Sequence, residues 1–386
     1  MPVPTIVVIG GSFAGVGVIK LLDSTLKDKA NIVLIEERDS FYQNLAALRS
    51  ITEPNLAQSV WIPYTHLFQF NKTSRVVQAR AVKLTPTAIE LSTGESIPFD
   101  YAVVATGSNV PSPGKSTQTE KTKGVHEAQQ ILEALKVAKS VAIVGGGVVG
   151  VELAGEIKTD YPGVKVTLLH ASASILNRAH ASATALKMAS KQLAGLGVEV
   201  RVGERVVKGQ DGNILPGGVG YNLSPITLRT EKGLEVQSDV QFVVTGITGP
   251  NSDLVVRGLG AEAVDSNGYV LVGETGQLKG HNNLFALGDV STLDNAKLAW
   301  FAGQQAGIVG ANLTLLVEGS GATLKGYKPS TPGAFLAISI GRNGGVLQTP
   351  IGTFGPWLPK TLKSKDLGVP KYWGLLNLEF KTTTPK

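Results

Sequence analysis

Short runs of β-branched and aliphatic residues recur along this chain, and apolar positions with helical spacing follow several of them. Two of these runs, residues 5–9 and 140–144, each lead into a glycine-rich turn and then into a helical stretch. A continuous apolar run before such a turn is typical of a parallel strand buried on both faces. The pattern therefore predicts an α/β protein with two strand, turn and helix units.

The rest of the pattern predicts further strands and helices. Two of the strands end in short Thr-Gly turns, Thr106-Gly107 and Thr245-Gly246, which let the chain leave a sheet tightly. Residues 111–123 are rich in Pro, Ser, Thr and Lys and indicate a linker. The predicted strands cover residues 31–36, 75–82, 88–91, 99–105, 164–170, 240–244 and 283–287, and the predicted helices cover residues 15–26, 128–137 and 297–317.

The two glycine turns read Gly10-Gly-Ser-Phe-Ala-Gly15 and Gly145-Gly-Gly-Val-Val-Gly150. Glycine permits a tight turn and a close approach of backbone to a pyrophosphate, and the positive end of the following helix favours its charge. Two such turns in one chain predict two dinucleotides bound side by side. The candidate contacts are Gly10, Gly11, Ser12, Phe13, Ala14 and Gly15 in the first turn, and Gly145, Gly147 and Gly150 in the second.

The first turn departs from the usual fingerprint at one position. Ser12 stands where the middle glycine would let the backbone approach the pyrophosphate. A small side chain is tolerable there, and its hydroxyl can donate a hydrogen bond to phosphate.

The residue that ends the strand after each turn differs between the two units. Glu36 ends the first such strand, where a carboxylate accepts hydrogen bonds from adenosine ribose hydroxyls; the alternative is a solvated glutamate. His170 ends the second, where an acid would select NAD. Because His170 is not an acid, NADP remains a candidate cofactor, with Arg178 as a candidate partner for its phosphate. The alternative is that His170 only caps the strand.

Composition sets the limits of the chemistry. The chain has 386 residues, 42% of them hydrophobic and 17% charged, which suits a globular protein of two or three domains. It has no cysteine, so structural disulfides, thiolate metal sites and a redox-active cysteine pair are excluded. Any redox chemistry must belong to a cofactor, and we expect no metal site.

The net charge of +6 is mild and indicates a solvated surface, or attraction to anionic cofactors or lipid. Nucleic-acid binding is not indicated, because no basic run interleaved with aromatic residues appears. The chain enters its first strand by Ile6, which argues against a signal peptide. Pro2 stands where myristoylation requires glycine, which argues against that lipid anchor. No apolar run is long enough to span a membrane. We therefore expect a cytoplasmic protein, with peripheral contact to an intracellular membrane left open.

The motifs stand in the order found in the two-dinucleotide flavoprotein reductases, which are related to glutathione reductase and type II NADH dehydrogenase. Within them the chain resembles the apoptosis-inducing-factor-like branch, through residues 39–49, 150–162, 341–344 and 363–367. The resemblance implies two Rossmann-like domains and a small C-terminal α+β region. It places the FAD-binding domain at residues 1–112 and 247–324, the NAD(P)H-binding domain at 113–246 and the C-terminal domain at 325–386.

The resemblance also implies roles for residues outside the turns. Glu36 would hold the ADP half of FAD, Arg49 and the backbone near Ala79 would touch FAD, and Asp289 would bind its ribityl or pyrophosphate region. The alternatives are a helix cap or loop acid for Asp289 and a surface ion pair for Arg49. Thr106, Gly107 and Gly246 would lie beside the cofactors.

For hydride transfer from NAD(P)H to FAD, the protein mainly has to orient the two cofactors and supply a suitable electrostatic environment. Glu152 and Glu156 lie one helical turn apart after the second glycine turn, and Glu156 is a candidate for the nicotinamide face; otherwise the pair is a solvated stripe. Lys297 is a candidate to stabilise a reduced anionic flavin, the alternative being a surface lysine. We take Glu156 and Lys297 as candidate catalytic residues.

A quinone-like acceptor is the leading hypothesis for the second substrate, and a homodimer is left open. The alternatives are a ferredoxin-type protein reductase and a redox-sensing flavoprotein that binds partners with little turnover. In the C-terminal segment Trp357, Leu358 and Leu362 lie among Lys360, Lys363 and Lys365. Most of its apolar residues would pack onto the flavin domain, but this composition is also that of an interfacial membrane contact.

Overall fold

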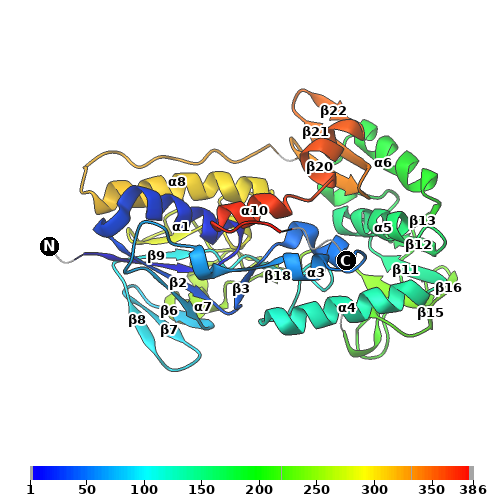
Figure 1. Ribbon diagram of the computed structural model, residues 1–386, viewed down its shortest axis with the longest axis horizontal. Helices are drawn as coiled ribbons and strands as arrows, with labels where there is room; N and C mark the ends of the chain where they lie inside the picture. Colours follow the sequence, from blue (N-terminus) through cyan, green and yellow to red (C-terminus); the bar gives the residue numbers. More distant parts are fainter. Residues whose placement is uncertain (1–2, 219, 332, 382–386) are drawn as a thin grey trace.

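The computed structural model describes residues 3–218, 220–331 and 333–381, with the side chain at position 178 left out. Two α/β units lie side by side along the long axis of the molecule (Figure 1). Three short strands near the C-terminus lie against the second unit. The arrangement agrees with the predicted fold of two Rossmann-like units and a small C-terminal α+β region.

The first unit contains the N-terminal elements and is completed by residues after 250. In chain order its elements are β1 (Thr5–Ile9), α1 (Phe13–Leu26), β2 (Asn31–Glu36), β3 (Ser40–Tyr42), α2 (Ala47–Ser50), α3 (Leu56–Ser59), β4 (Trp61–Pro63), β5 (Arg75–Gln78), β6 (Ala81–Leu84), β7 (Ala88–Leu91), β8 (Ser96–Pro98), β9 (Tyr101–Val104), α7 (Asp253–Leu259), β19 (Leu284–Ala286) and α8 (Ala299–Val317).

Its central sheet has five parallel strands in the order β19-β9-β1-β2-β5. Successive side chains of β1 point to opposite faces. Ile6 and Val8 pack under α1 and α8, which lie next to each other in Figure 1, whereas Val7 and Ile9 pack toward α7 and the antiparallel strands β6 to β8. Both faces are covered, which explains the continuous apolar run of β1.

The second unit repeats this plan between the two segments of the first. Its elements are β10 (Ser108–Asn109), α4 (Lys121–Val137), β11 (Ser140–Val144), α5 (Val148–Asp160), β12 (Lys165–His170), α6 (Ala183–Gly195), β13 (Val198–Val202), β14 (Tyr221–Asn222), β15 (Ile226–Arg229), β16 (Glu235–Ser238), β17 (Val240–Val243) and β18 (Gly249–Pro250). The sheet order is β13-β12-β11-β17-β14, and only β14 runs antiparallel to its neighbour.

The two chain segments that connect the units pair with each other. Strand β10 leaves the first unit and β18 returns to it, and they form an antiparallel ladder in which Ser108 faces Pro250 and Asn109 faces Gly249. The ladder continues through Asn251, whose backbone N–H donates to the carbonyl of Gly107 at 2.9 Å and whose side chain donates to the carbonyl of Thr106 at 3.0 Å. This pairing ties the carboxyl ends of the two sheets together.

The C-terminal region follows a segment that runs back over α8 toward the second unit (Figure 1). Its elements are β20 (Leu336–Ile340), β21 (Gly344–Thr349), β22 (Gly352–Phe354), α9 (Trp357–Pro359), a π-helical turn (Lys360–Ser364) and α10 (Val369–Leu375). Ile338 and Val346 share a core with α5 and α6, whereas Leu376 shares one with α1 and α8. The region thus packs on both units; the domain boundaries stay predictions.

Three helix starts differ from those expected, and the first of these helices, α1, begins at Phe13 rather than at Gly15. Helix α4 begins at Lys121, within the predicted linker, because Gly124 lets its first turn lie directly against Trp61, where a Cβ atom would collide with the indole ring. Helix α8 begins at Ala299, so Lys297 precedes it by two residues and lies outside the helix. The three C-terminal strands were not predicted from the sequence; β21 and β22 contain glycines that interrupt the alternation of apolar residues, and β20 is only five residues long.

Candidate functional site

The first glycine turn is held in a conformation that only glycine adopts easily. Gly10 has φ +101°, and a Cβ atom there would collide with the carbonyl oxygen of Ala105. A Cβ atom on Gly15 would collide with the carbonyl oxygen of Gly10. Helix α1 therefore starts directly over the end of β1, and within the described residues no side chain caps its first turn. Its N–H groups are left for an anionic ligand.

The second turn repeats this geometry. Gly145 has φ +121°, and its Cβ atom would collide with the carbonyl oxygen of Val244, just as that of Gly150 would collide with Gly145. Gly147 precedes α5 at the position that Ser12 holds before α1. Ser12 makes no side-chain cap to its helix in the described structure, so its hydroxyl is left for a ligand. Each unit thus carries an open helix start that fits a dinucleotide pyrophosphate.

The strand-end residues occupy matching places. The backbone N–H of Gly11 donates to Glu36 Oε2 at 2.5 Å, and that of Gly146 donates to His170 Nδ1 at 3.1 Å. Glu36 is buried, which excludes the solvated alternative. His170 Nε2 lies 3.2 Å from Asn177 Oδ1. Because Nδ1 accepts a hydrogen bond, the ring proton belongs on Nε2. The side chain of Arg178, the candidate phosphate partner, lies outside the described residues.

Two more predicted residues lie against the first turn. A Cβ atom on Gly288 would come within 3.1 Å of the Ala14 side chain, so the turn that carries Asp289 packs on α1. Asp289 Oδ2 accepts a hydrogen bond from Ser108 at 2.8 Å. The backbone N–H of Ala79 donates to the Glu36 carbonyl at 3.0 Å. The sheet therefore gathers Glu36, Ala79, Thr106, Gly107 and Asp289 around the carboxyl ends of its strands.

The aromatic ring of Phe13 points away from this edge. It packs edge-on against Tyr372 of α10, with ring centroids 5.0 Å apart, and against Phe41 at 5.4 Å. Phe13 is thus left to contact a ligand through its backbone N–H group. Tyr64 supports the same turn, because its hydroxyl donates to the Gly11 carbonyl at 2.6 Å. Nothing local in the sequence indicates these long-range contacts of Tyr64 and Tyr372.

Arg49 and Glu156 form one buried ion pair. Arg49 Nε and Nη2 donate to the two carboxylate oxygens of Glu156, both at 2.8 Å, and the side chains are 2% and 1% exposed. Arg49 also donates to the carbonyl oxygens of Ser364 and Lys365. Burial raises the pKa of Glu156, and the Arg49 guanidinium acts in the opposite direction. The pair is neither solvated nor at the surface, and its roles in FAD binding and hydride transfer stay predictions.

Glu152, one turn earlier on α5, has a different partner. Its Oε1 accepts hydrogen bonds from Lys363 Nζ at 2.6 Å and from the backbone and hydroxyl of Ser339. Lys363 is mostly buried, unlike Lys360 and Lys365, which are exposed. Sequence reasoning grouped the three lysines as one surface; the structure separates them, because one is used inside the molecule.

Lys297 is also paired inside the molecule. Its Nζ donates to the carbonyl oxygens of Ser291 at 2.7 Å and Asp294 at 2.6 Å, and lies 4.4 Å from the centre of the Tyr269 ring. Burial lowers the pKa of Lys297, and the charge of Asp289 opposes this effect. Lys297 is therefore a partly buried cation near Asp289; its action on a flavin stays a prediction.

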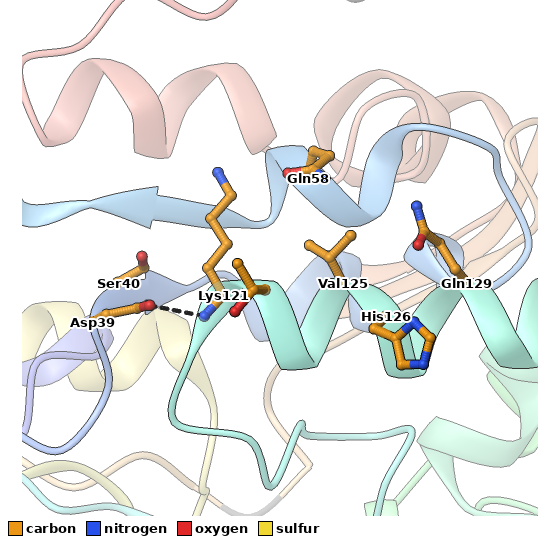
Figure 2. Close-up of a pocket in the computed structure, with 8 residues that line it drawn as sticks. Asp39, Ser40, Gln58, Lys121, Val125, His126 and Gln129 are labelled. Carbon is orange, nitrogen blue, oxygen red and sulfur yellow. Dashed lines mark hydrogen bonds between the residues drawn. The ribbon is translucent and has the colours of Figure 1, made fainter.

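A surface cavity of about 590 Å³ lies at the seam between the units, beside the start of α4 (Figure 2). Asp39 accepts a hydrogen bond from the Lys121 backbone at one end of it, and Gln58, Val125 and His126 line the rest. None of the predicted cofactor contacts lines this cavity. The glycine turns, rather than this opening, define the candidate site.

The duplicated turn and the paired connecting segments define a protein with two dinucleotide-binding units. The chain belongs to the pyridine nucleotide-disulphide oxidoreductase family, whose model matches residues 4–306. It is accordingly an oxidoreductase that uses FAD and NAD(P)H. Because it has no cysteine, the dithiol chemistry in the family's name is excluded for this chain.

Comparison with individual relatives identifies the branch of the family to which the chain is similar. The chain is 30% identical over 385 residues to apoptosis-inducing factor homolog B of Dictyostelium discoideum, with 96% of each chain covered. It is 31% identical over 369 residues to human ferroptosis suppressor protein 1, with 95% of this chain and 94% of the relative covered. These matches confirm the predicted apoptosis-inducing-factor-like branch.

The fold is shared more widely. The sulfide:quinone oxidoreductase of Aquifex aeolicus superposes with a TM-score of 0.72 over 97% of this chain and 92% of its own, at 16% identity. Among the described helices of our chain, none combines the length and apolar character needed to cross a membrane.

Proposed function

We propose that the chain oxidises NAD(P)H at the second glycine turn, through FAD held at the first, and passes the electrons to a quinone-type acceptor. The observation that carries this proposal is the repetition of one turn geometry at the carboxyl ends of two sheets joined by the β10 and β18 ladder. When bound, FAD accepts a hydride from NAD(P)H and returns electrons to a second acceptor.

The residues of the chain bind and orient the two ligands. Backbone N–H groups at the starts of α1 and α5 hold the pyrophosphates, and Glu36 accepts hydrogen bonds from the ribose of FAD. Asp289 accepts from a hydroxyl of the ribityl chain. Lys297 keeps positive charge near Asp289, and burial keeps water from the Arg49 and Glu156 pair that fixes α5.

Anaerobic reduction tests cofactor and donor together. We expect the purified protein to be yellow with about one FAD per chain, and NADPH to bleach its absorbance before a short-chain quinone restores it. Gly10→Ala should lose FAD, because its Cβ atom would collide with Ala105, whereas Gly163→Ala, which meets nothing within 4 Å in the described structure, should keep it.

Other outcomes would assign the alternatives. A folded, colourless wild-type protein that takes up no added FAD would overturn the proposal. Bleaching by NADPH without reoxidation by quinones would instead favour the redox-sensing flavoprotein. Electron transfer to a ferredoxin but not to quinones would favour the protein reductase.

We further propose that the C-terminal region touches a membrane surface from which a lipid-soluble quinone is taken. Ile351, in the turn between β21 and β22, is 89% exposed. Trp357 and Leu362, on α9 and on the π-helical turn that packs against it, are 68% and 67% exposed. Lys360 and Lys365 are exposed beside them. Apolar side chains flanked by lysine suit an anionic lipid surface.

A further inference from the structure

One face of helix α5 carries three acidic residues, and each is paired with a cation from another part of the chain. Glu152, Glu156 and Asp160 are spaced four residues apart, so they lie along one side of the helix. The first two hold cations near the start and the middle of the helix. Asp160 is the last residue of α5 and holds Arg342. This third pair therefore lies at the opposite end of α5 from the second glycine turn.

Arg342 lies in the turn between β20 and β21, and two glycines bring this turn directly against α5. Gly341 has φ +63°, and a Cβ atom on it would collide with the side chain of Thr159. A Cβ atom on Gly155 would come within 2.8 Å of the Ile340 backbone. Because neither position has room for a side chain, the turn rests on the helix and places Arg342 beside its last residue.

The guanidinium of Arg342 joins acidic residues from the two units. Its Nη1 donates to Asp160 of the second unit, and its Nη2 donates to Glu53 Oε2 of the first unit at 2.8 Å. Glu53 follows α2, where its backbone N–H donates to the Arg49 carbonyl at 2.8 Å. Within the part of the chain that the structure describes, the Asp160 side chain accepts no other hydrogen bond, and its Oδ2 is buried without a partner. Without Arg342, two carboxylates from different units would face each other here.

Helix α5 therefore connects the second glycine turn to a contact with the first unit. Its residues, Val148–Asp160, span about 20 Å at 1.5 Å per residue. In the proposed function, the contacts of NAD(P)H with the glycine turn and with His170 belong to the second unit alone. The separation of nicotinamide and flavin instead depends on how the two units are placed. A misplacement of ~1 Å in such a geometry can cost about 100-fold in rate.

We propose that Arg342 is a positioning residue that, through Glu53 and Asp160, sets the placement of the NAD(P)H-binding unit against the flavin-binding unit. This inference rests on the proposed function, because it takes the two ligands to be FAD and NAD(P)H. Arg342 acts through the far end of α5, so its loss should slow hydride transfer without weakening nucleotide binding.

The test uses the full chain loaded with FAD. We expect Arg342→Gln to keep its FAD and a Kd for NADP⁺ within about twofold of the wild type, but to reduce its flavin about tenfold or more slowly at saturating NADPH. The long-wavelength absorbance of nicotinamide stacked on flavin should weaken in parallel. Arg342→Lys should keep most of the rate, because it leaves a cation between the two carboxylates. Arg229→Gln is the matched control, since it breaks an exposed ion pair with Glu235 in the second unit.

A second variant changes the first unit instead. Glu53→Lys places a cation against Arg342 and should slow flavin reduction in the same way, at an unchanged Kd for NADP⁺. Glu53 is partly exposed, so this variant keeps the test decisive should Arg342→Gln not fold.

The remaining outcomes would count against the inference. Wild-type rates of flavin reduction in both Arg342→Gln and Glu53→Lys would overturn the positioning role and leave the proposed function standing. A Kd for NADP⁺ that rises as far as the rate falls, or an equal loss of rate in Arg229→Gln, would also overturn it, because the effect would then not depend on how the units are placed. A wild-type flavin that NADPH does not reduce would overturn the proposed function itself, and this inference with it.

Discussion

At the scale of single residues, one position decides what each glycine turn accepts. In both units the side chain at the strand end accepts a hydrogen bond from the backbone N–H of the second glycine in the turn. Glu36 and His170 therefore have the same structural role. They differ in charge. A carboxylate attracts ribose hydroxyls and repels an added phosphate, whereas a neutral imidazole with its proton on Nε2 does not repel it.

We therefore predict that NADPH reduces the flavin at least as fast as NADH, and that His170→Glu shifts the preference toward NADH by roughly tenfold or more. The reason is that a like charge facing the 2′-phosphate costs at least ~1.4 kcal/mol. Stopped-flow reduction with both donors measures the ratio. His170→Gln is the control, because it keeps an acceptor for Gly146 and adds no charge. Tenfold faster wild-type reduction by NADH would contradict the interpretation.

At the scale of elements, helix α5 is fixed from two sides. Glu156 holds Arg49 of α2, and Glu152 holds Lys363 of the C-terminal region. Since Arg49 also donates to the backbone at residues 364 and 365, one guanidinium connects both units and the C-terminal region. The relative position of the two nucleotide sites therefore depends on a few polar contacts as well as on apolar packing.

We predict that Arg49→Met lowers the free energy of unfolding by about 3 to 5 kcal/mol, because it leaves the Glu156 carboxylate buried without its partner. Arg49→Met with Glu156→Leu should cost less than Arg49→Met alone. Denaturant titration of each variant gives these values. Lys83→Met, which breaks the exposed pair with Glu90, should cost about 1 kcal/mol or less and serves as the control. Equal losses for Arg49→Met and Lys83→Met would show that the buried pair is not a structural tie.

At the scale of the whole molecule, the C-terminal region places one apolar corner in solvent. Its strands pack on the second unit and α10 packs on the first, so most of its apolar residues are used internally. Trp357 and Leu362 are not, and they lie beside two exposed lysines. Of the three lysines at 360, 363 and 365, Lys363 is paired with Glu152, so Lys360 and Lys365 remain to act at a surface.

We predict salt-sensitive binding to anionic phospholipid vesicles that Lys360→Glu with Lys365→Glu reduces roughly tenfold or more, since each lysine adds ~1 kcal/mol near such a surface. Activity on a water-soluble quinone should be kept. Vesicle co-sedimentation at low salt makes the measurement, and Lys208→Glu with Lys232→Glu, the same charge change on the second unit, should bind like the wild type. Equal binding by all three proteins would leave this corner without a membrane role.

Local sequence patterns were enough to predict the two nucleotide units. A glycine that needs positive φ and a strand buried on both faces leave local signals, so both turns, the strand ends at Glu36 and His170, and most central strands could be predicted. The start of α4 could not be, because it depends on Trp61 accepting Gly124 from a distant part of the chain.

Contacts between distant residues were decided only by the tertiary structure. Arg49 and Glu156 were each candidates for cofactor chemistry, yet nothing in the sequence indicated that they bind each other, because their separation along the chain hides the pairing. The same holds for Lys363 with Glu152. A charged side chain shows its type in the sequence, but whether it meets solvent, a ligand or an opposite charge depends on which elements the fold brings beside it.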